Sequence, residues 1–195
     1  MIPLQYLQIR FLLKPAKFVV IIGYERKNIK GGESVRLFIA ISLSEEIQKA
    51  LVGVMHDLKK QGVSGNYVPA QNLHMTLAFI GEYEEPKKVR EVIAKVPFPE
   101  IRLCLTGTGN FGNIFWAGVK GNQKLKTYVK DLRSALRAEG IPCDNEKFIP
   151  HITLIRRMSV KNPYQIRMPK VEMTVKRASL MKSEIKDGKV TYKMM

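Results

Sequence analysis

One four-residue pattern occurs twice in this chain, in NLHMTLAFIG at residues 72–81 and in FIPHITLIRR at residues 148–157. Each stretch carries His, an apolar residue, Thr and Leu in that order. The chain has 3 histidines, 7 threonines and 17 leucines among its 195 residues. Two histidines would share this frame by chance in roughly 1 of 30,000 sequences of such composition. The repetition therefore indicates a duplicated functional element rather than two unrelated core histidines.

The segments around the two motifs predict an α+β fold. A helix starts at Ser44, whose side chain can cap it, and the apolar residues from Ile47 to Leu58 recur at helical spacing. The other predicted elements, in chain order, are strands over 36–42 and 67–81, a helix from Pro86, strands over 100–112 and 113–121, a helix over Leu125–Leu136, a strand over 148–158, and a hairpin within 171–195 that turns at Asp187 and Gly188. This order favours two related lobes with mainly antiparallel sheets over a doubly wound parallel sheet.

Composition and charge narrow the class of protein. The 33 Lys and Arg residues outnumber 17 Asp and Glu, which gives a formal net charge of +16. A positive field of this size attracts phosphate-bearing partners, although a solvated lysine-rich surface is the alternative explanation of the charge. No apolar run reaches the 18 residues of a membrane span, so we expect no membrane association. Cys104 and Cys143 lie in no zinc or disulfide pattern, and a reducing cytoplasm is the compartment that fits best.

Residues 1–34 differ from the rest of the chain. Their short apolar run is broken by Lys14, Pro15 and Lys17, and no cleavage site of a signal peptide follows it. We interpret 1–34 as an N-terminal extension of unknown role, with an added strand, a basic membrane-surface segment and an artefact of start-codon choice before Val35 as the alternatives. Residues 35–195 are predicted to form a single bilobal domain.

The paired motifs suit acid–base chemistry on a phosphodiester. In a strand, residues two apart share a face, so His74 lies beside Thr76 and His151 beside Thr153. An imidazole has a pKa near 6.5, which lets one histidine act as a base on the attacking oxygen and the other as an acid on the leaving oxygen. The threonine hydroxyls can hydrogen-bond the phosphate oxygens. No acidic cluster has metal-ligand spacing, so neither a metal nor another cofactor is predicted.

These residues resemble the 2H phosphoesterases, a family with two His-x-Thr/Ser-x motifs, and most closely its RNA 2',3'-cyclic phosphodiesterase branch, also called 2'-5' RNA ligase. The resemblance rests on RLFIAISL from Arg36, NLHMTLAFIGE, IFWAGV and FIPHITLIRR, and covers about four-fifths of the chain. It implies a bilobal fold with pseudo-twofold symmetry, in which two sheets line a central cleft and the helices lie outside. It also implies metal-independent opening of an RNA 2',3'-cyclic phosphate to a 2'-phosphate.

By the same resemblance, His74 is the general acid, His151 is the general base, and Thr76 and Thr153 bind the phosphate. Phe79 and Arg156 match positions that contact base and phosphate in relatives. Strict strand alternation would put each of these two on the face opposite its histidine, so a twist or a strand end would have to bring it round. A core Phe and a surface Arg are the alternative interpretations.

Several alternatives remain open at the level of sequence. His56 lies off the apolar stripe of its helix and is assigned no role, and Trp116 is interpreted as a core residue rather than a base-stacking one. The substrate can be RNA ends, including those of tRNA fragments, or a small nucleotide such as ADP-ribose cyclic phosphate, and the reaction can also run backwards as 2'-5' ligation. A non-catalytic RNA-binding module is the rival from another class. We expect a monomer.

Overall fold

The computed structural model describes residues 35–186 and 188–195. The predictions for the N-terminal extension, and Asp187 at the predicted hairpin turn, lie outside these residues. Residues 35–195 fall within one compact unit. Within the described part of the chain, no helix is long and apolar enough to cross a membrane.

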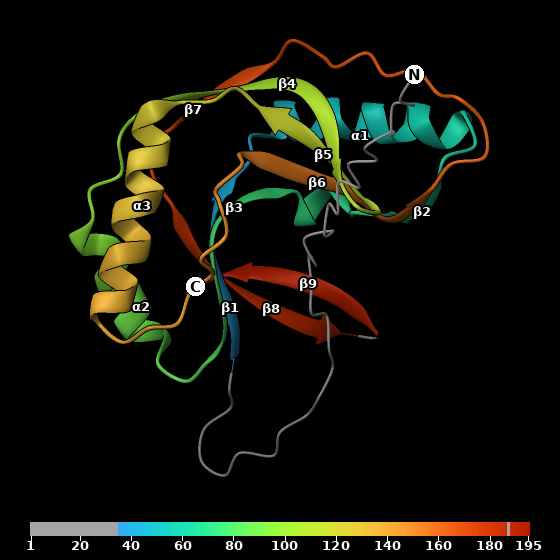
Figure 1. The fold of residues 1–195 in the computed structure, drawn as a ribbon. Coiled ribbons are helices and arrows are strands. Elements are labelled where there is room, and N and C mark those ends of the chain that lie inside the picture. The colour runs from blue at the N-terminus through green and yellow to red at the C-terminus, as the bar shows by residue number, and fades with distance from the viewer. Residues whose placement is uncertain (1–34, 187) are drawn as a thin grey trace, which may run out of the picture. The chain divides into compact units, whose positions relative to one another are not determined.

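Nine strands and three α-helices make up the described chain (Figure 1). The helices are α1 (Glu45–Lys60), α2 (Pro86–Lys95) and α3 (Gln123–Ala138), and a 3-10 turn spans Ala70–Asn72. The strands are β1 (Val35–Ser42), β2 (Ser64–Tyr67), β3 (His74–Tyr83), β4 (Ile101–Phe111), β5 (Ile114–Val119), β6 (His151–Ser159), β7 (Glu172–Val175), β8 (Ser179–Lys186) and β9 (Lys189–Met194).

The strands form two sheets, and every pair in them is antiparallel. One sheet has the order β3-β1-β8-β9, and the other has the order β2-β6-β5-β4-β7. The sheets meet where the two motif strands, β3 and β6, contact each other. The predicted α+β fold with two antiparallel sheets is therefore confirmed.

Two of the helices pack against the motif strand from the other half of the chain. Helix α1, from the first half, packs against β6, whereas α3, from the second half, packs against β3 and against α2. Figure 1 shows α2 and α3 together on one side and α1 on the other. Because each motif strand is supported by a helix from the opposite half, the apolar residues of both sheets and all three helices merge into one continuous core.

The predicted ends of α1 are confirmed. The Ser44 hydroxyl accepts a hydrogen bond from the backbone N–H of Ile47 at 3.4 Å, and Glu45 and Glu46 lie in the first turn. Gly62 follows the helix with a φ of +81°, a conformation that favours glycine. The apolar stripe faces the core as expected, with Ile47, Leu51, Val54, Met55 and Leu58 buried.

One predicted strand and the extent of the predicted hairpin are wrong in part. The single strand expected over 67–81 is divided into β2, the 3-10 turn and β3, because Pro69 has no N–H to donate to a ladder and precedes the turn. Strand β2 then pairs with β6 in the other sheet. Within 171–195 only β8 and β9 form the expected hairpin, whereas β7 pairs with β4.

Candidate active site

Each motif histidine is the first residue of its strand, and both strands begin with the same geometry. His74 opens β3 and His151 opens β6, each with its threonine two residues further on the same face. All four side chains are half-buried. Among the hydrogen bonds of the described residues, none involves the hydroxyl of Thr76 or Thr153. Both hydroxyls are therefore available to a ligand.

A backbone carbonyl fixes each imidazole ring. Nδ1 of His74 lies 2.7 Å from the carbonyl oxygen of Asn72, and Nδ1 of His151 lies 2.7 Å from that of Ile149. A carbonyl oxygen only accepts hydrogen bonds, so Nδ1 is the protonated nitrogen and Nε2 is left to exchange a proton with a substrate. Asn72 is itself held, because its side-chain amide donates to the carbonyl of Val190 at 2.8 Å.

Both imidazoles release a proton more readily than a free histidine does. Burial lowers the pKa of His74, against the opposing effect of the Asn72 carbonyl, and the positive charges of Arg156 and His151 lower it further. Burial also lowers the pKa of His151, against the effect of the Ile149 carbonyl, and Arg156 again adds to the shift. The shared influence of Arg156 and the coupling between the histidines bring all three side chains into one electrostatic site.

A β-bulge in each motif strand brings Phe79 and Arg156 to the face of the histidines. In β3, Thr76 pairs with Ala40 and Ala78 pairs with Ile39, which leaves Leu77 as the extra residue. The extra residue shifts the alternation by one, so the fifth residue after His74 shares its face.

The bulge in β6 repeats this arrangement at the equivalent position. Thr153 pairs with Trp116 and Ile155 pairs with Phe115, which leaves Leu154 as the extra residue. Arg156 therefore lies on the face of His151. The sequence analysis required a twist or a strand end to bring both residues round, and a bulge does so instead, because it reverses the side-chain direction of the residues that directly follow it.

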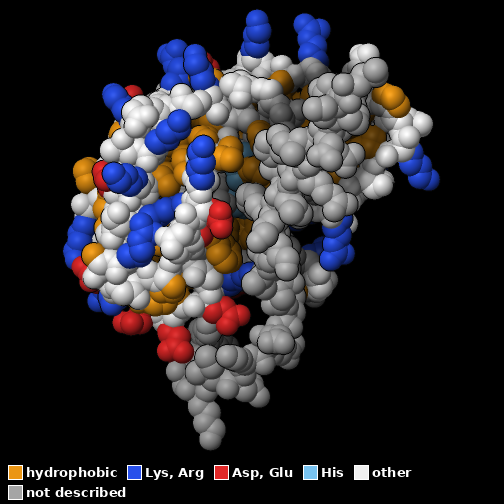
Figure 2. Space-filling model, in the orientation of Figure 1, with side chains coloured by type: hydrophobic (Ala, Val, Ile, Leu, Met, Phe, Trp, Pro, Cys, Tyr) orange, Lys and Arg blue, Asp and Glu red, His pale blue; other side chains and the backbone are white. Residues whose placement is uncertain are grey.

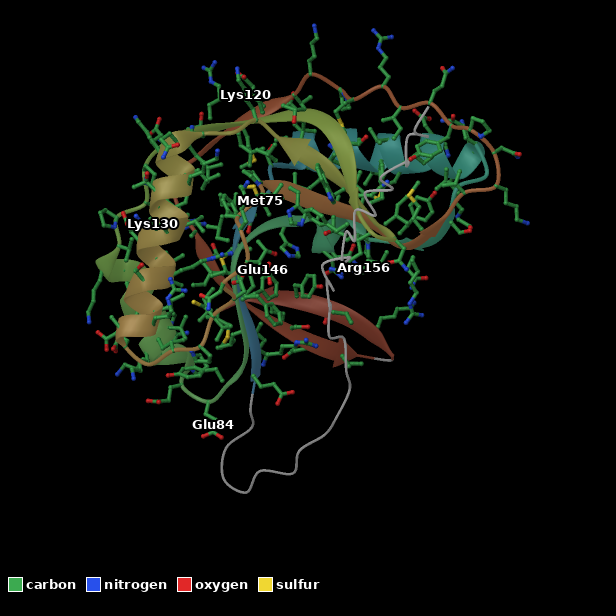
Figure 3. The ribbon with its side chains drawn as sticks, in the orientation of Figure 1. Met75, Glu84, Lys120, Lys130, Glu146 and Arg156 are labelled. Atoms are coloured by element: carbon green, nitrogen blue, oxygen red, sulfur yellow. The ribbon has the colours of Figure 1, made fainter. Side chains whose placement is uncertain are left out.

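Phe79 and Arg156 are both accessible from this face. Phe79 is 40% exposed, so it is not a core residue, and the Arg36 guanidinium lies 5.2 Å from its ring centroid. Arg156 is half-buried and has no ion pair among the described residues. Figure 3 shows Arg156 on the side of the chain opposite α3. An unpaired guanidinium beside two imidazoles and two free hydroxyls is suited to an anion.

Aromatic rings surround each histidine, and sequence reasoning missed most of them. The His74 ring lies 4.9 Å from Phe38 and 5.1 Å from Tyr192, and the His151 ring lies 5.0 Å from Phe111 and 5.9 Å from Trp116, between centroids. These rings contribute to the burial that lowers the histidine pKa values. Phe38 and Ala40 are two residues apart in β1 and therefore share a face, and Ala40 pairs with Thr76 of the first motif. This period-2 pattern is the one feature of the sequence that could have placed Phe38 beside His74.

Trp116 was expected to be a core residue, and the structure instead places it half-buried beside His151. Its indole lies over Gly109 of the neighbouring strand, where a Cβ atom would overlap the ring. Glycine is therefore required at this position for Trp116 to pack. His56 is exposed on α1 and takes no part in the site.

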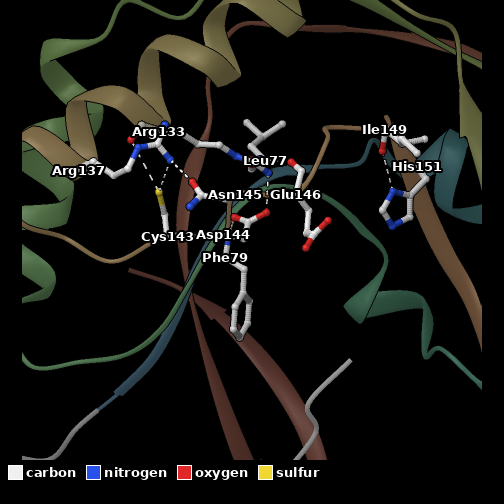
Figure 4. A network of polar contacts seen from close by, with 10 residues as sticks. All are labelled: Leu77, Phe79, Arg133, Arg137, Cys143, Asp144, Asn145, Glu146, Ile149 and His151. Atoms are coloured by element: carbon white, nitrogen blue, oxygen red, sulfur yellow. Dashed lines mark hydrogen bonds and ion pairs between the residues drawn. The ribbon is translucent and has the colours of Figure 1, made fainter. Parts of the chain in front are cut away.

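A buried guanidinium connects the first motif strand to the segment that precedes the second (Figure 4). Arg133 of α3 donates from Nε to the carbonyl of Leu77 at 3.1 Å, from Nη1 to the carbonyl of Glu146 at 2.7 Å, and from Nη2 to Oδ2 of Asp144 at 2.7 Å. The other oxygen of Asp144 accepts from the Phe79 N–H at 2.7 Å. Arg133 thus holds both the bulge that follows His74 and the segment that precedes His151. No sequence motif marked this residue.

Within residues 35–186 and 188–195, no group of three or more His, Cys, Asp or Glu side chains is arranged to hold a metal ion. Cys104 and Cys143 are both free.

The two antiparallel sheets and the duplicated His-x-Thr pairs are the features of a phosphoesterase of the two-histidine class. The family model of the 2'-5' RNA ligase superfamily matches residues 43–187. The chain belongs to this superfamily, as the resemblance of its motifs to the 2H phosphoesterases predicts.

Individual relatives and solved structures agree with this assignment. An RNA 2',3'-cyclic phosphodiesterase of Thermotoga maritima is 30% identical over 83% of this chain and 93% of its own length. The Escherichia coli K12 protein of the same name is 33% identical over 65% of this chain and 74% of its own length. The crystal structure of E. coli LigT complexed with 3'-AMP superimposes with a TM-score of 0.73 at 29% identity, over 84% of this chain and 96% of that one.

Proposed function

We propose that this protein hydrolyses the 2',3'-cyclic phosphate at RNA ends to a 2'-phosphate by metal-independent acid–base catalysis. The observation that carries the proposal is the pair of imidazoles in one electrostatic site, each with Nδ1 bonded to a carbonyl and Nε2 left free. This is the arrangement that a concerted proton donation and proton removal requires.

In the proposed reaction, Nε2 of His151 removes a proton from water as the water oxygen attacks phosphorus. The bond between phosphorus and the ribose 3'-oxygen breaks, and Nε2 of His74 gives its proton to that oxygen. The 2'-ester bond stays intact, so the product carries a 2'-phosphate. The near-identical surroundings of the two histidines suit either division of labour, and the family likeness assigns His74 as the acid.

The other side chains act on charge. Negative charge grows on the non-bridging phosphate oxygens in the transition state, and the hydroxyls of Thr76 and Thr153 can donate hydrogen bonds to them. Arg156 offsets the charge of the phosphate. Because its positive charge lowers the pKa values of both histidines in the free enzyme, a bound phosphate reverses that effect. Phe79 presents an exposed ring to the base of the terminal nucleotide.

The relatives support RNA as the substrate, and the net charge of +16 agrees with it. A small nucleotide that carries a cyclic phosphate, such as ADP-ribose cyclic phosphate, is the second candidate substrate. It is favoured because E. coli LigT has also been crystallised with two small nucleotides, ATP and NADP+. The same geometry would catalyse 2'-5' ligation if the 5'-hydroxyl of a second RNA replaced water: its oxygen would bond to phosphorus, and the bond from phosphorus to the ribose 3'-oxygen would break as before. A non-catalytic binder is disfavoured because both His-x-Thr pairs are present.

The test is incubation of the purified protein, in EDTA, with a short RNA that ends in a 2',3'-cyclic phosphate, followed by assignment of the phosphate position in the product. We expect a 2'-phosphate. His74→Ala and His151→Ala should each lower kcat/KM by on the order of 10² to 10⁴. His56→Ala, which changes the exposed third histidine, is the control and should retain full activity. Full activity in either motif variant would refute the mechanism.

We further infer that residues 35–195 act as a monomer, since one chain supplies every residue of the site. The two free cysteines agree with a cytoplasmic enzyme, and tRNA fragments are candidate substrates there. Light scattering of the purified protein tests the oligomeric state.

A further inference from the structure

A cationic hollow lies next to α3, apart from the histidines. It has a volume of about 220 Å³, and its lining includes Lys126, Lys130, Arg133, Arg137, Asn145 and Phe148. We call it the α3 groove. Four of these residues carry a positive charge, and none of the lining residues is acidic.

Three of the four positive charges of the α3 groove have no acidic partner among the described residues, whereas Arg133 pairs with Asp144. Lys126 and Lys130 are exposed, and neither has an ion pair among the described residues. Arg137 bonds only neutral partners, Oδ1 of Asn145 at 2.8 Å and Sγ of Cys143 at 3.5 Å. Lysines four residues apart on a helix repel each other by roughly 0.2 to 0.5 kcal/mol. Such a concentration of like charge suits a polyanionic ligand.

The α3 groove is joined to the catalytic site by a short, anchored segment. Phe148, at the groove, precedes His151 by three residues, so their Cα atoms are at most about 11 Å apart. This segment is fixed at both ends, by Arg133 at the carbonyl of Glu146 and by the N–H of Val119 at the carbonyl of Pro150.

Figures 2 and 3 show how the basic side chains of α3 lie in relation to the site. Figure 2 shows Lys and Arg side chains gathered over α3 on the face where histidine atoms are visible. Figure 3 shows Glu146 between Lys130 and Arg156. Glu146 is exposed, but it is not among the residues that line the groove.

We propose that the α3 groove binds the phosphodiester backbone of the RNA strand that leads to the cyclic phosphate, upstream of the terminal nucleotide. The half-buried Phe148 offers a ring on which a base can stack. The inference rests on the proposed function and adds to it that the substrate is a strand of several nucleotides. Single-stranded RNA of several nucleotides is bound both at the α3 groove and at the catalytic histidines, whereas a mononucleotide cyclic phosphate reaches only the histidines.

The experiment measures binding by fluorescence anisotropy of a labelled RNA of about ten nucleotides that ends in a 2'-phosphate, from about 50 to 200 mM salt. Each phosphate contact contributes about −0.7 to the slope of log K against log salt for a single strand. The double variant Lys126→Ala/Lys130→Ala should therefore lose about 1.4 from the magnitude of the slope. Lys124→Ala is the matched control, because Lys124 is exposed on the same helix but does not line the groove.

A second measurement separates this inference from the proposed function. In the double variant, kcat/KM should fall for the ten-nucleotide cyclic phosphate and stay unchanged for a nucleoside 2',3'-cyclic monophosphate. An unchanged salt slope, or an equal fall for both substrates, would overturn the α3 groove and leave the phosphodiesterase standing. Absence of turnover in the wild-type protein would refute the proposed function, while the binding slopes would still decide the groove.

Discussion

Replacement of Arg133 by Met tests whether one buried guanidinium holds the two halves of the catalytic site together. Arg133 is 9% exposed and donates hydrogen bonds to the carbonyls of Leu77 and Glu146 and to the Asp144 carboxylate. Met has a similar length and fills the space, but it leaves all three acceptors without this donor. The expected result is a loss of stability and a loss of rate that can be measured separately.

The stability loss follows from the burial of the pair. Removal of one partner from a buried ion pair costs about 3 to 5 kcal/mol. The Asp144 side chain is 27% exposed and keeps its bond to the Phe79 N–H, so the lower limit of about 3 kcal/mol applies. In a domain of this size that corresponds to a fall in Tm of about 6 to 12 °C. Arg137→Met, one turn later and exposed with neutral partners, is the control and should change stability by about 0.5 kcal/mol or less.

The rate loss separates positioning from simple destabilisation. It is measured well below the Tm on a nucleoside 2',3'-cyclic monophosphate, which does not reach the α3 groove. A shift of the Leu77 bulge moves His74, and a shift at Glu146 moves His151, so kcat should fall by about 10- to 100-fold with a smaller change in KM. Arg133→Lys keeps the charge but cannot span three acceptors, and should restore more of the Tm than of kcat.

A double-mutant cycle with Asp144→Asn, which preserves the acceptor for the Phe79 N–H, isolates the ion pair from the two carbonyl bonds. The reasoning would be refuted by Arg133→Met with an unchanged Tm, or by a folded Arg133→Met enzyme with unchanged kcat. The first outcome would mean that the pair is no better than an apolar contact. The second would mean that the histidines are placed by their strands alone.

Three further predictions concern the site itself. Because the pKa values of both motif histidines are lowered, kcat/KM should follow a bell-shaped profile with its maximum below about pH 6.5. Arg156→Gln removes a charge that lowers both pKa values and should move the profile to higher pH; an unmoved profile contradicts this. Thr76→Val and Thr153→Val should each lower kcat by on the order of 10² without a change in circular dichroism, and unchanged kcat would remove that hydroxyl from the mechanism. Gly109→Ala should displace the indole of Trp116, the single tryptophan, and lower the free energy of unfolding by about 1 to 3 kcal/mol in a denaturant titration. The tryptophan fluorescence emission should shift, and an unshifted emission would mean that the indole has not moved.

The sequence was sufficient for the three helices, for most of the strands and for the motif, because these have a periodic signature. The helix cap at Ser44, the apolar stripe of α1 and the two His-x-Thr pairs depend on spacing within a few residues. The bulges at Leu77 and Leu154 have no such signature, since a leucine in a bulge and one in a regular strand look the same in sequence. Prediction by strict alternation therefore failed for Phe79 and Arg156, the residues that follow the bulges.

Long-range partners were the other part that sequence could not supply. Tyr192 packs on His74 from 118 positions away, and Arg133 reaches Leu77 from 56 positions away. Helical periodicity places Arg133 among the apolar residues of α3, where a charged residue is a mismatch. That mismatch was the one available signal, because an arginine on a buried helix face needs acceptors from elsewhere in the fold.

The bulges also explain why leucine belongs to the duplicated pattern. They explain as well why an arginine supports the bulge of β3 but not the bulge of β6. Catalysis needs only His and Thr, but the leucine that follows is buried in the bulge and leaves a carbonyl outside the regular ladder. In β6 that carbonyl accepts from the N–H of Val68, because β2 flanks β6. Strand β3 is the edge of its sheet, so no strand can supply an amide there. The Nε of Arg133 takes that position, so the two motif strands differ where the sheet that contains β3 lacks a flanking strand.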